Sequence, residues 1–235
     1  MMRAGPQAQL LASGEYEYLR DGVSVPVYES WQLSRTARGL SLFSHREVPA
    51  ASLVISAKAC FAGAGLQRCY LQWCSGAALE PVAKAFYTAT PAVSRYRYRG
   101  HGARTQSIDA QNAHFFPLMR VFAGGVIHGL AAGGGSGRVL VPWIHDPSMQ
   151  QRLFEPEFSD RSVRQLGSEK DPRLDHFHYS GGRYESGADY WLLNGLLQEY
   201  RWQQGDAEWT VRLKNPAGVW PGEEVWGRIS AAESA

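Results

Sequence analysis

Short turn motifs at regular spacing in the C-terminal part of the chain are the feature that most restricts its fold. Gly181-Gly182, Asn194-Gly195 and Gly205-Asp206 each separate two runs that are rich in aromatic residues. Asn-Gly between alternating runs favours a two-residue hairpin, because both central residues of a type I′ turn need a positive φ. The spacing therefore predicts an antiparallel meander in this part of the chain.

The N-terminal half follows the same pattern. Turns are expected at Asp21-Gly22, around Arg38-Gly39 and from Gly63 to Gly65, and Pro26 predicts a break or an edge position within a strand. Counted over the whole chain, the runs predict roughly a dozen strands. Before the C-terminal ladder, the expected strands cover residues 14–20, 23–35, 40–48, 52–59, 66–73, 83–89, 93–100 and 104–110.

The centre of the chain has a different pattern. Pro117 precedes an apolar segment that ends in glycines, which predicts a helix of about three turns. This helix is apolar nearly all round and is expected to be buried, and Gly124-Gly125 either weakens it or allows another group to approach closely. After a buried strand, Asp146 and Pro147 predict the start of a second, short helix.

These elements predict a mainly β fold: a strongly curved antiparallel meander, as a half-barrel or barrel, with one or two helices packed on its concave side. A length of 235 residues is typical of a single domain, expected over residues 1–235 with an ordered core of about 13–227. Twenty-four basic residues against 22 acidic ones leave a net charge of +2, which does not by itself indicate a polyanionic partner.

The terminal and cysteine patterns indicate a cytoplasmic protein. The N-terminus lacks the apolar run of a secretory signal, and no segment approaches the ~20 apolar residues of a membrane span, so no stable membrane insertion is expected. Cys60, Cys69 and Cys74 lack the spacing of a zinc site, and their odd number is more typical of reduced thiols. The oligomeric state is not indicated.

Counting outward from the hairpin turns assigns side chains to faces. If both turns contain two residues, His178 faces Glu185 and Asp189 faces Tyr200. This face is either solvated, with Phe177 and Leu192 on the core side, or it lines a concave interior that contains aromatic walls and convergent polar groups. Its members are His176, His178, Glu185, Asp189, Trp191, Gln198, Tyr200 and Trp202.

The second alternative suggests acid-base chemistry. His178 with Glu185 would move protons, while Asp189 and Tyr200 would position a substrate or stabilise charge. His176 and His178 project to the same side of a strand, but Glu185 comes seven residues after His178, whereas a cupin-like site places a Glu three or four residues after it. No metal site is expected. Because nucleotide-binding motifs are missing too, no cofactor is expected.

Two further patterns leave alternatives open. Arg95, Arg97 and Arg99 alternate with two tyrosines, but alternation places the two residue types on opposite faces, so no nucleic-acid partner is expected. The arginines would form a solvated stripe or hold a phosphate or carboxylate at a cavity mouth. His145 either lies at the turn that Asp146 caps or looks into a cavity.

The order of strands and helices over residues 15 to 214 resembles the lipoprotein-carrier (LolA/LolB-like) half-barrels, although no signal peptide like that of the periplasmic members is present. The resemblance implies a hydrophobic cavity between sheet and helices that suits a lipid, polyketide or terpenoid chain. Binding of a hydrophobic small molecule is the leading hypothesis, and a cofactor-independent isomerase, cyclase or dehydratase is the alternative. Nucleic-acid binding through Arg95, Arg97 and Arg99 is a third hypothesis and ranks last. Besides Tyr200, the expected ligand-binding residues are Phe122, Trp143, His145, His176, Trp191 and Trp202.

Overall fold

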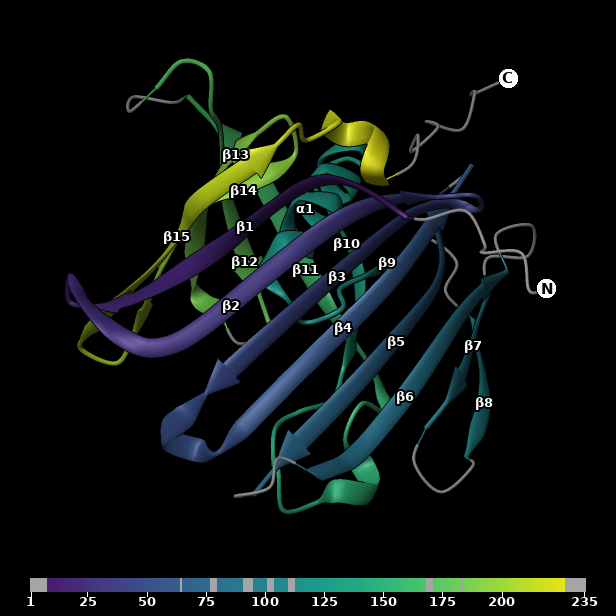
Figure 1. Ribbon diagram of the computed structural model, residues 1–235. Helices are drawn as coiled ribbons and strands as arrows, with labels where there is room; N and C mark the ends of the chain where they lie inside the picture. Colours follow the sequence, from purple (N-terminus) through teal and green to yellow (C-terminus); the bar gives the residue numbers. More distant parts are fainter. Residues whose placement is uncertain are drawn as a thin grey trace.

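A computed structural model describes residues 8–63, 65–76, 80–90, 95–100, 104–109, 113–167, 171–182 and 184–226. Over these residues one large curved sheet of fifteen strands surrounds a single α-helix, α1 (Ala123–Ala132) (Figure 1). The strands of the first half are β1 (Gln9–Arg20), β2 (Val23–Thr36), β3 (Gly39–Val48), β4 (Leu53–Ala62), β5 (Gly65–Ser75), β6 (Glu80–Thr90), β7 (Arg95–Arg99) and β8 (Thr105–Asp109). Those of the second half are β9 (Ala113–Phe115), β10 (Ser136–Pro142), β11 (Pro156–Leu166), β12 (Asp175–Gly181), β13 (Tyr184–Leu193), β14 (Leu196–Gln204) and β15 (Ala207–Gly218).

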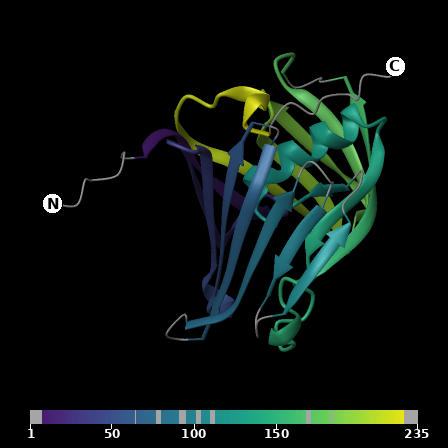
Figure 2. The same ribbon diagram turned by 90° about the vertical axis from the view of Figure 1, so that its right-hand side faces the viewer.

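The sheet consists of two meanders joined along one strand pair. Its order is β8-β7-β6-β5-β4-β3-β2-β1-β15-β14-β13-β12-β11-β10-β9, so β1 of the first meander pairs with β15 of the second. Among the described strands, every pairing is antiparallel except that of β9 with β10. The sheet curves around α1, which lies on the concave side (Figure 2). The predicted fold class is confirmed, as a curved sheet that is not closed.

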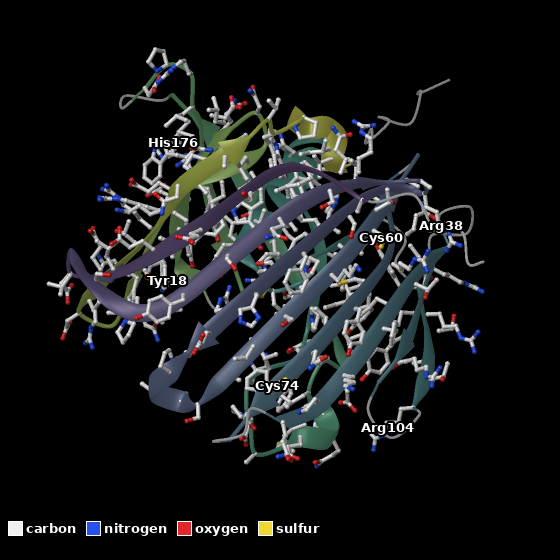
Figure 3. The ribbon with its side chains drawn as sticks, viewed as in Figure 1. Tyr18, Arg38, Cys60, Cys74, Arg104 and His176 are labelled. Carbon is white, nitrogen blue, oxygen red and sulfur yellow. The ribbon has the colours of Figure 1, made fainter. Side chains whose placement is uncertain are left out.

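The end strands of this sheet, β8 and β9, do not pair with each other, but side chains of β6, β7 and Arg104 contact β9 and the segment before β11. The ring of Phe115 in β9 lies 4.7 Å from that of Tyr87 and 5.5 Å from that of Tyr96, measured between centroids. The Tyr87 hydroxyl donates a hydrogen bond of 2.5 Å to the Phe154 carbonyl, and Arg104, labelled in Figure 3, lies 2.6 Å from the Glu155 carboxylate. The fold is therefore barrel-like in shape while its hydrogen-bonded ladder is open.

The turn residues form the hairpins that the sequence predicts. Asp21 and Gly22 have φ of 51° and 78°, and Asn194 and Gly195 have φ of 50° and 77°, as a type I′ turn requires. The flanking residues pair across each turn, Arg20 with Val23 and Leu193 with Leu196. These local signals are sufficient to fix where neighbouring strands reverse.

The central helix begins later than the sequence predicts. Leu118 has a positive φ of 70° and Met119 is extended, so α1 begins at Ala123, after a 3-10 turn, η4 (Arg120–Phe122). Six of its ten residues are buried, which confirms the expected burial. The glycine-rich end at Gly133 also agrees with the prediction.

The second predicted helix is wrong. Asp146 accepts hydrogen bonds from the backbone N–H and hydroxyl of Ser148, but only a 3-10 turn, η5 (Gln150–Arg152), follows. Leu153 and Phe154 are fully buried, and Phe154 adopts a positive φ of 68° while its N–H bonds to the Trp143 carbonyl. Anchoring of these two side chains in the core ends the helical turn.

Other differences concern strands and ends. Strands β9 and β11 were not predicted, because neither has a clear alternation between turn signals. Strand β1 begins at Gln9 and Ala12 is buried, so order starts before the predicted residue 13. The expectation of a loose end at 228–235 lies outside the described residues. A short 3-10 segment, η1 (Pro49–Ala51), joins β3 and β4, and another, η6 (Gly222–Trp226), follows β15.

Gly124 is a position where α1 closely approaches the β13–β14 turn. A Cβ at this position would overlap the Gly195 carbonyl oxygen, which also accepts a hydrogen bond from the Trp226 indole. The sequence left two roles open for this glycine, and close approach is the one the structure has. Gly125 is similar, since a Cβ there would press on the Trp226 ring.

We expect Gly124→Ala to lower the free energy of unfolding by about 1–3 kcal/mol, as overpacking does. Helix propensity alone would favour alanine by about 1 kcal/mol, so a loss would show that the close approach outweighs it. Urea denaturation measures the change. The control is Gly167→Ala, where a Cβ meets no atom within 4 Å and little change is expected. Stabilisation by Gly124→Ala would contradict the packing of α1 on the β13–β14 turn.

Candidate functional site

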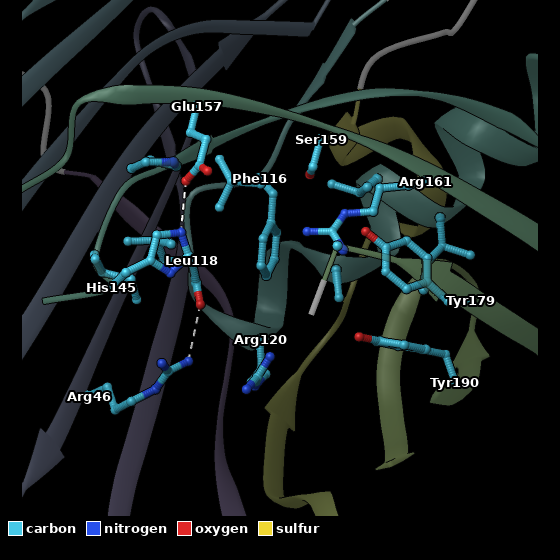
Figure 4. A pocket seen from close by; sticks show the side chains of 17 residues that line it. Arg46, Phe116, Leu118, Arg120, His145, Glu157, Ser159, Arg161, Tyr179 and Tyr190 are labelled. Atoms are coloured by element: carbon cyan, nitrogen blue, oxygen red, sulfur yellow. Dashed lines mark hydrogen bonds and ion pairs between the residues drawn. The ribbon is translucent and has the colours of Figure 1, made fainter. Parts of the chain in front are cut away.

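A pocket of about 470 Å³ lies between the concave face of the second meander and the segment that leads into α1 (Figure 4). One wall is apolar and comes from the helical segment and β10, with Phe116, Leu118, Val126, Ile127 and Val141. The polar and charged lining groups come from β3, η4, β11, β12 and β13, and from His145 in the loop after β10. The pocket therefore has an apolar side and a polar side.

A buried carboxylate fixes the first of the pocket's three arginines. Glu29, which is 2% exposed, receives hydrogen bonds from Arg46 at 2.7 Å, the Tyr18 hydroxyl at 2.5 Å and the Arg120 backbone N–H at 2.6 Å. Arg46 also donates to the Leu118 carbonyl at 3.2 Å. Glu29 thus connects β1, β2 and β3 to the segment that begins the helix.

Burial and neighbouring charges shift the pKa values of the groups in this cluster. Burial lowers the pKa of Arg46, but the Glu29 carboxylate and Tyr18 together outweigh it, and the pKa of Arg46 is raised. Burial also raises the pKa of Tyr18 well above its ordinary value, so its hydroxyl stays protonated and donates to Glu29. Within the low-dielectric interior each of these groups depends on the others for solvation.

Aromatic rings support the other two arginines. The Arg120 guanidinium carbon lies 4.8 Å from the centroid of the Tyr200 ring and 5.8 Å from that of Trp202. The Arg161 guanidinium carbon lies 5.8 Å from the Tyr179 centroid, and Arg161 donates a hydrogen bond to the Gly181 carbonyl. These contacts hold two cations at the polar side of the pocket by cation-π attraction.

The polar side also contains a histidine and a carboxylate. His145 Nε2 lies 2.7 Å from the Glu157 carboxylate, and the two side chains are 35% and 49% exposed. The His145 ring packs edge-on against Trp143, at 5.6 Å between centroids. Because both groups are partly exposed while lining the pocket, they lie where it meets solvent.

The predicted cross-strand partner of His178 is wrong. His178 pairs with Asp189, and its Nδ1 lies 3.1 Å from that carboxylate. The hairpin turn lies one residue later than the predicted Gly181-Gly182 turn, since Gly181 itself pairs with Tyr184, and a further register shift between Tyr179 and Gly181 places extra residues in β13. Gly187 in this stretch has a φ of 78°, and a Cβ there would overlap the His178 ring. The side chain of Glu185 lies outside the described part of the structure.

The predicted pairing of Asp189 with Tyr200 is also wrong. A bulge between Trp191 and Leu192 makes Gln198 an extra residue of β14, so Asp189 pairs with Arg201 and Tyr190 with Tyr200. Tyr200 and Trp202 therefore point to the concave side. The described members of the predicted group are divided between the two faces of the sheet.

The outer face of the sheet carries His176, His178, Asp189 and Trp191. Phe177 and Leu192, at neighbouring strand positions, belong to the buried core, so the solvated alternative is the one that the structure has. His176, labelled in Figure 3, stacks on Trp191 with centroids 4.5 Å apart and covers that ring. This group is separated from the pocket by the sheet.

Of the predicted ligand-binding residues, only His145 is among those that line the pocket. Phe122 and Trp143 are buried in the core, and Trp202 supports Arg120. The predicted stripe of Arg95, Arg97 and Arg99 is exposed, whereas Tyr98 is buried, so the two residue types lie on opposite faces as predicted.

Sequence reasoning missed the pocket's arginines and the carboxylate behind them. Glu29 lies on the same inward face of β2 as Trp31 and Leu33, and Arg46 lies on the same inward face of β3 as Leu42. A charged residue therefore occupies an inward position on each of two adjacent strands. A lone acid and a lone base at inward positions of paired strands is a signal that could have found them.

The described residues contain neither a cluster suited to a metal ion nor a helix suited to crossing a membrane. No group of three or more His, Cys, Asp or Glu side chains in that part of the chain is placed to hold a metal ion. None of the described helices is both long and apolar enough to cross a membrane.

Comparisons with known proteins bear on the fold. No protein-family model and no curated protein matches the chain. Among solved structures, a β-barrel-like protein of the domain of unknown function DUF1849 from Brucella abortus matches with a TM-score of 0.53 and 8% identity. The match covers 91% of this chain and 100% of that one. The shared architecture is β-barrel-like, and at this identity the comparison shows the fold alone.

We expect Glu29→Leu to lower the free energy of unfolding by about 3–5 kcal/mol, because it leaves the Arg46 charge without its buried partner. Adding Arg46→Met removes that charge, so the double variant should recover part of the loss. Urea denaturation of the two single variants and the double variant measures this coupling. A double variant no more stable than Glu29→Leu would show that the ion pair does not support the fold.

Proposed function

We propose that the protein binds a small molecule with an apolar body in the concave pocket. The observation that supports this is the pocket itself, whose volume of about 470 Å³ falls within the range of about 300–1,000 Å³ that is usual for ligand sites. An apolar wall would supply affinity through burial, and the convergent polar groups opposite would fix orientation.

The architecture supports a lipid-like chain as the apolar body. A curved open sheet with a helix on its concave side is the arrangement on which the resemblance to lipoprotein-carrier half-barrels rests. That resemblance implies a hydrophobic cavity suited to a lipid, polyketide or terpenoid chain. The Leu118, Val126 and Ile127 side chains would lie along such a chain.

A second candidate is a cofactor-independent isomerase, cyclase or dehydratase that acts on such a ligand. The observation in its favour is the 2.7 Å contact between His145 and Glu157, which suits orientation of a general base. His178 and Asp189 offer the same chemistry but lie on the outer face. Turnover of a ligand extracted from the purified protein should be lost in His145→Gln with affinity retained. A variant with unchanged turnover would exclude this role for His145.

We expect straight-chain alcohols from octanol to decanol to bind, with affinity rising about fourfold for each added CH₂, since each buried CH₂ contributes about 0.8 kcal/mol. Neutral alcohols test the apolar wall alone. Isothermal titration calorimetry measures the dissociation constants. The absence of binding throughout the series would contradict the proposed function.

Val141→Trp should abolish this binding, because Val141 lines the pocket and an indole would occupy its volume. The matched control is Val23→Trp, at a strand position that is 69% exposed, where binding should be unchanged. Calorimetry on both variants locates the site. Equal binding by Val141→Trp and native protein would place the alcohols elsewhere.

A further inference from the structure

We infer that the ligand carries an oxyanion, a carboxylate or a phosphate, which is held at the Arg161 side of the pocket. This inference rests on the proposed function and names the chemical class of its ligand. It follows from the charges around the pocket, from two buried polar atoms and from the shape of the groups that surround them.

Charge around the pocket is predominantly positive. Three arginines, Arg46, Arg120 and Arg161, line it, against the single carboxylate of Glu157. The Glu29 carboxylate behind the wall neutralises Arg46, and Glu157 lies against His145. Arg161 makes no ion pair with any residue in the described ranges. Arg161 is therefore a pocket arginine whose charge no carboxylate among the described residues compensates.

Two polar atoms on β11 strengthen this assignment. Ser159 Oγ and Arg161 Nε are buried and have no hydrogen-bond partner among the described residues. Ser159 and Arg161 are two residues apart on one strand, so their side chains project to the same face, and both line the pocket. Burying such groups without a partner is unfavourable, and an oxyanion in the pocket would supply an acceptor for both.

The surrounding groups fit an anion of this shape. Figure 4 shows Arg161 beside the Tyr179 hydroxyl, with the Tyr190 hydroxyl directed towards the centre of the pocket and Arg120 further down in the view. A planar guanidinium matches the paired oxygens of a carboxylate or phosphate, and tyrosine hydroxyls donate to either. Gly182 makes this possible, because a Cβ there would overlap the Arg161 guanidinium.

The ligand would then be an amphiphile with its head group at Arg161 and its chain against the helical wall. Phe116 and Val126 lie on the apolar side, and the Arg120 guanidinium lies over the Tyr200 ring. A cationic head group would meet Arg120 and Arg161 and be repelled. A neutral head group would leave the guanidinium donors without charge-assisted partners.

Four ligands that share one alkyl chain test the inference: dodecanoate, dodecyl phosphate, dodecanol and dodecyltrimethylammonium. Calorimetry at concentrations below micelle formation should show at least one anion binding about tenfold or more tightly than dodecanol. Dodecyltrimethylammonium should bind more weakly than dodecanol. The comparison of the two anions distinguishes a carboxylate ligand from a phosphate ligand.

Arg161→Gln should reduce binding of the preferred anion about tenfold more than it reduces binding of dodecanol. The matched control is Arg138→Gln on the adjacent strand, since Arg138 also lies over an aromatic ring, that of Phe158 at 4.1 Å, but does not line the pocket. Neither ligand should respond to this control. Arg161→Lys should retain part of the preference, because it keeps the charge and loses the planar fork.

The outcomes separate the two proposals. Equal affinity for dodecanol and both anions would overturn the oxyanion inference and leave the proposed function standing. No binding by any of the four would overturn both. Should Arg161→Gln fail to fold, the comparison of the four ligands on the native protein still decides the head-group preference.

Discussion

The rest of the structure depends on the hydrogen bonds that the buried Glu29 carboxylate accepts. This carboxylate lies on β2 yet binds groups from β1, from β3 and from the segment before α1. Within the interior such a group is stable only when each oxygen is satisfied, and here Tyr18, Arg46 and the Arg120 N–H satisfy them. The helical segment is thereby fixed to the first meander while α1 itself packs on the second.

This attachment explains why a pocket lies beside α1. Gly124 and Gly125 allow the helix to approach the β13–β14 turn and Trp226, whereas the preceding residues are held towards β3 by Arg46. The segment before α1 therefore connects two parts of the curved sheet. The pocket lies between this segment and strands β10 and β11. The charged groups that position the segment also form one side of the pocket. Structure and proposed binding thus share the same residues.

The local part of the fold could be predicted from the sequence. Asp21-Gly22 and Asn194-Gly195 determine turns through backbone conformation, which a few residues encode completely. The faces of β14 could not be predicted, because the bulge at Gln198 follows from packing across strands and reverses every side chain beyond it. The expected helix after Asp146 failed for a related reason: core burial of Leu153 and Phe154 overrode a valid local start signal.

The candidate site was the least predictable part. The contact of Arg46 with Leu118 joins residues 72 positions apart, and Arg161 reaches its place only when β11, a strand without a clear pattern, is in position. Residues for which the sequence predicts acid-base chemistry, such as His178 and Asp189, lie on the outer face. The signal that was present, an inward acid and an inward base on adjacent strands, has meaning only once the register is known.

Methyl-resolved NMR during titration with dodecanoate or dodecyl phosphate, whichever binds, tests the central claim most directly. The account predicts that the methyl resonances of Leu118, Val126, Ile127, Val141 and Ile144 shift on binding, because these residues line the pocket. Those of Val23 and Val219, which are 69% and 77% exposed, should stay unchanged. Shifts confined to exposed methyl groups, with the five pocket residues unaffected, would contradict a binding site on the concave face.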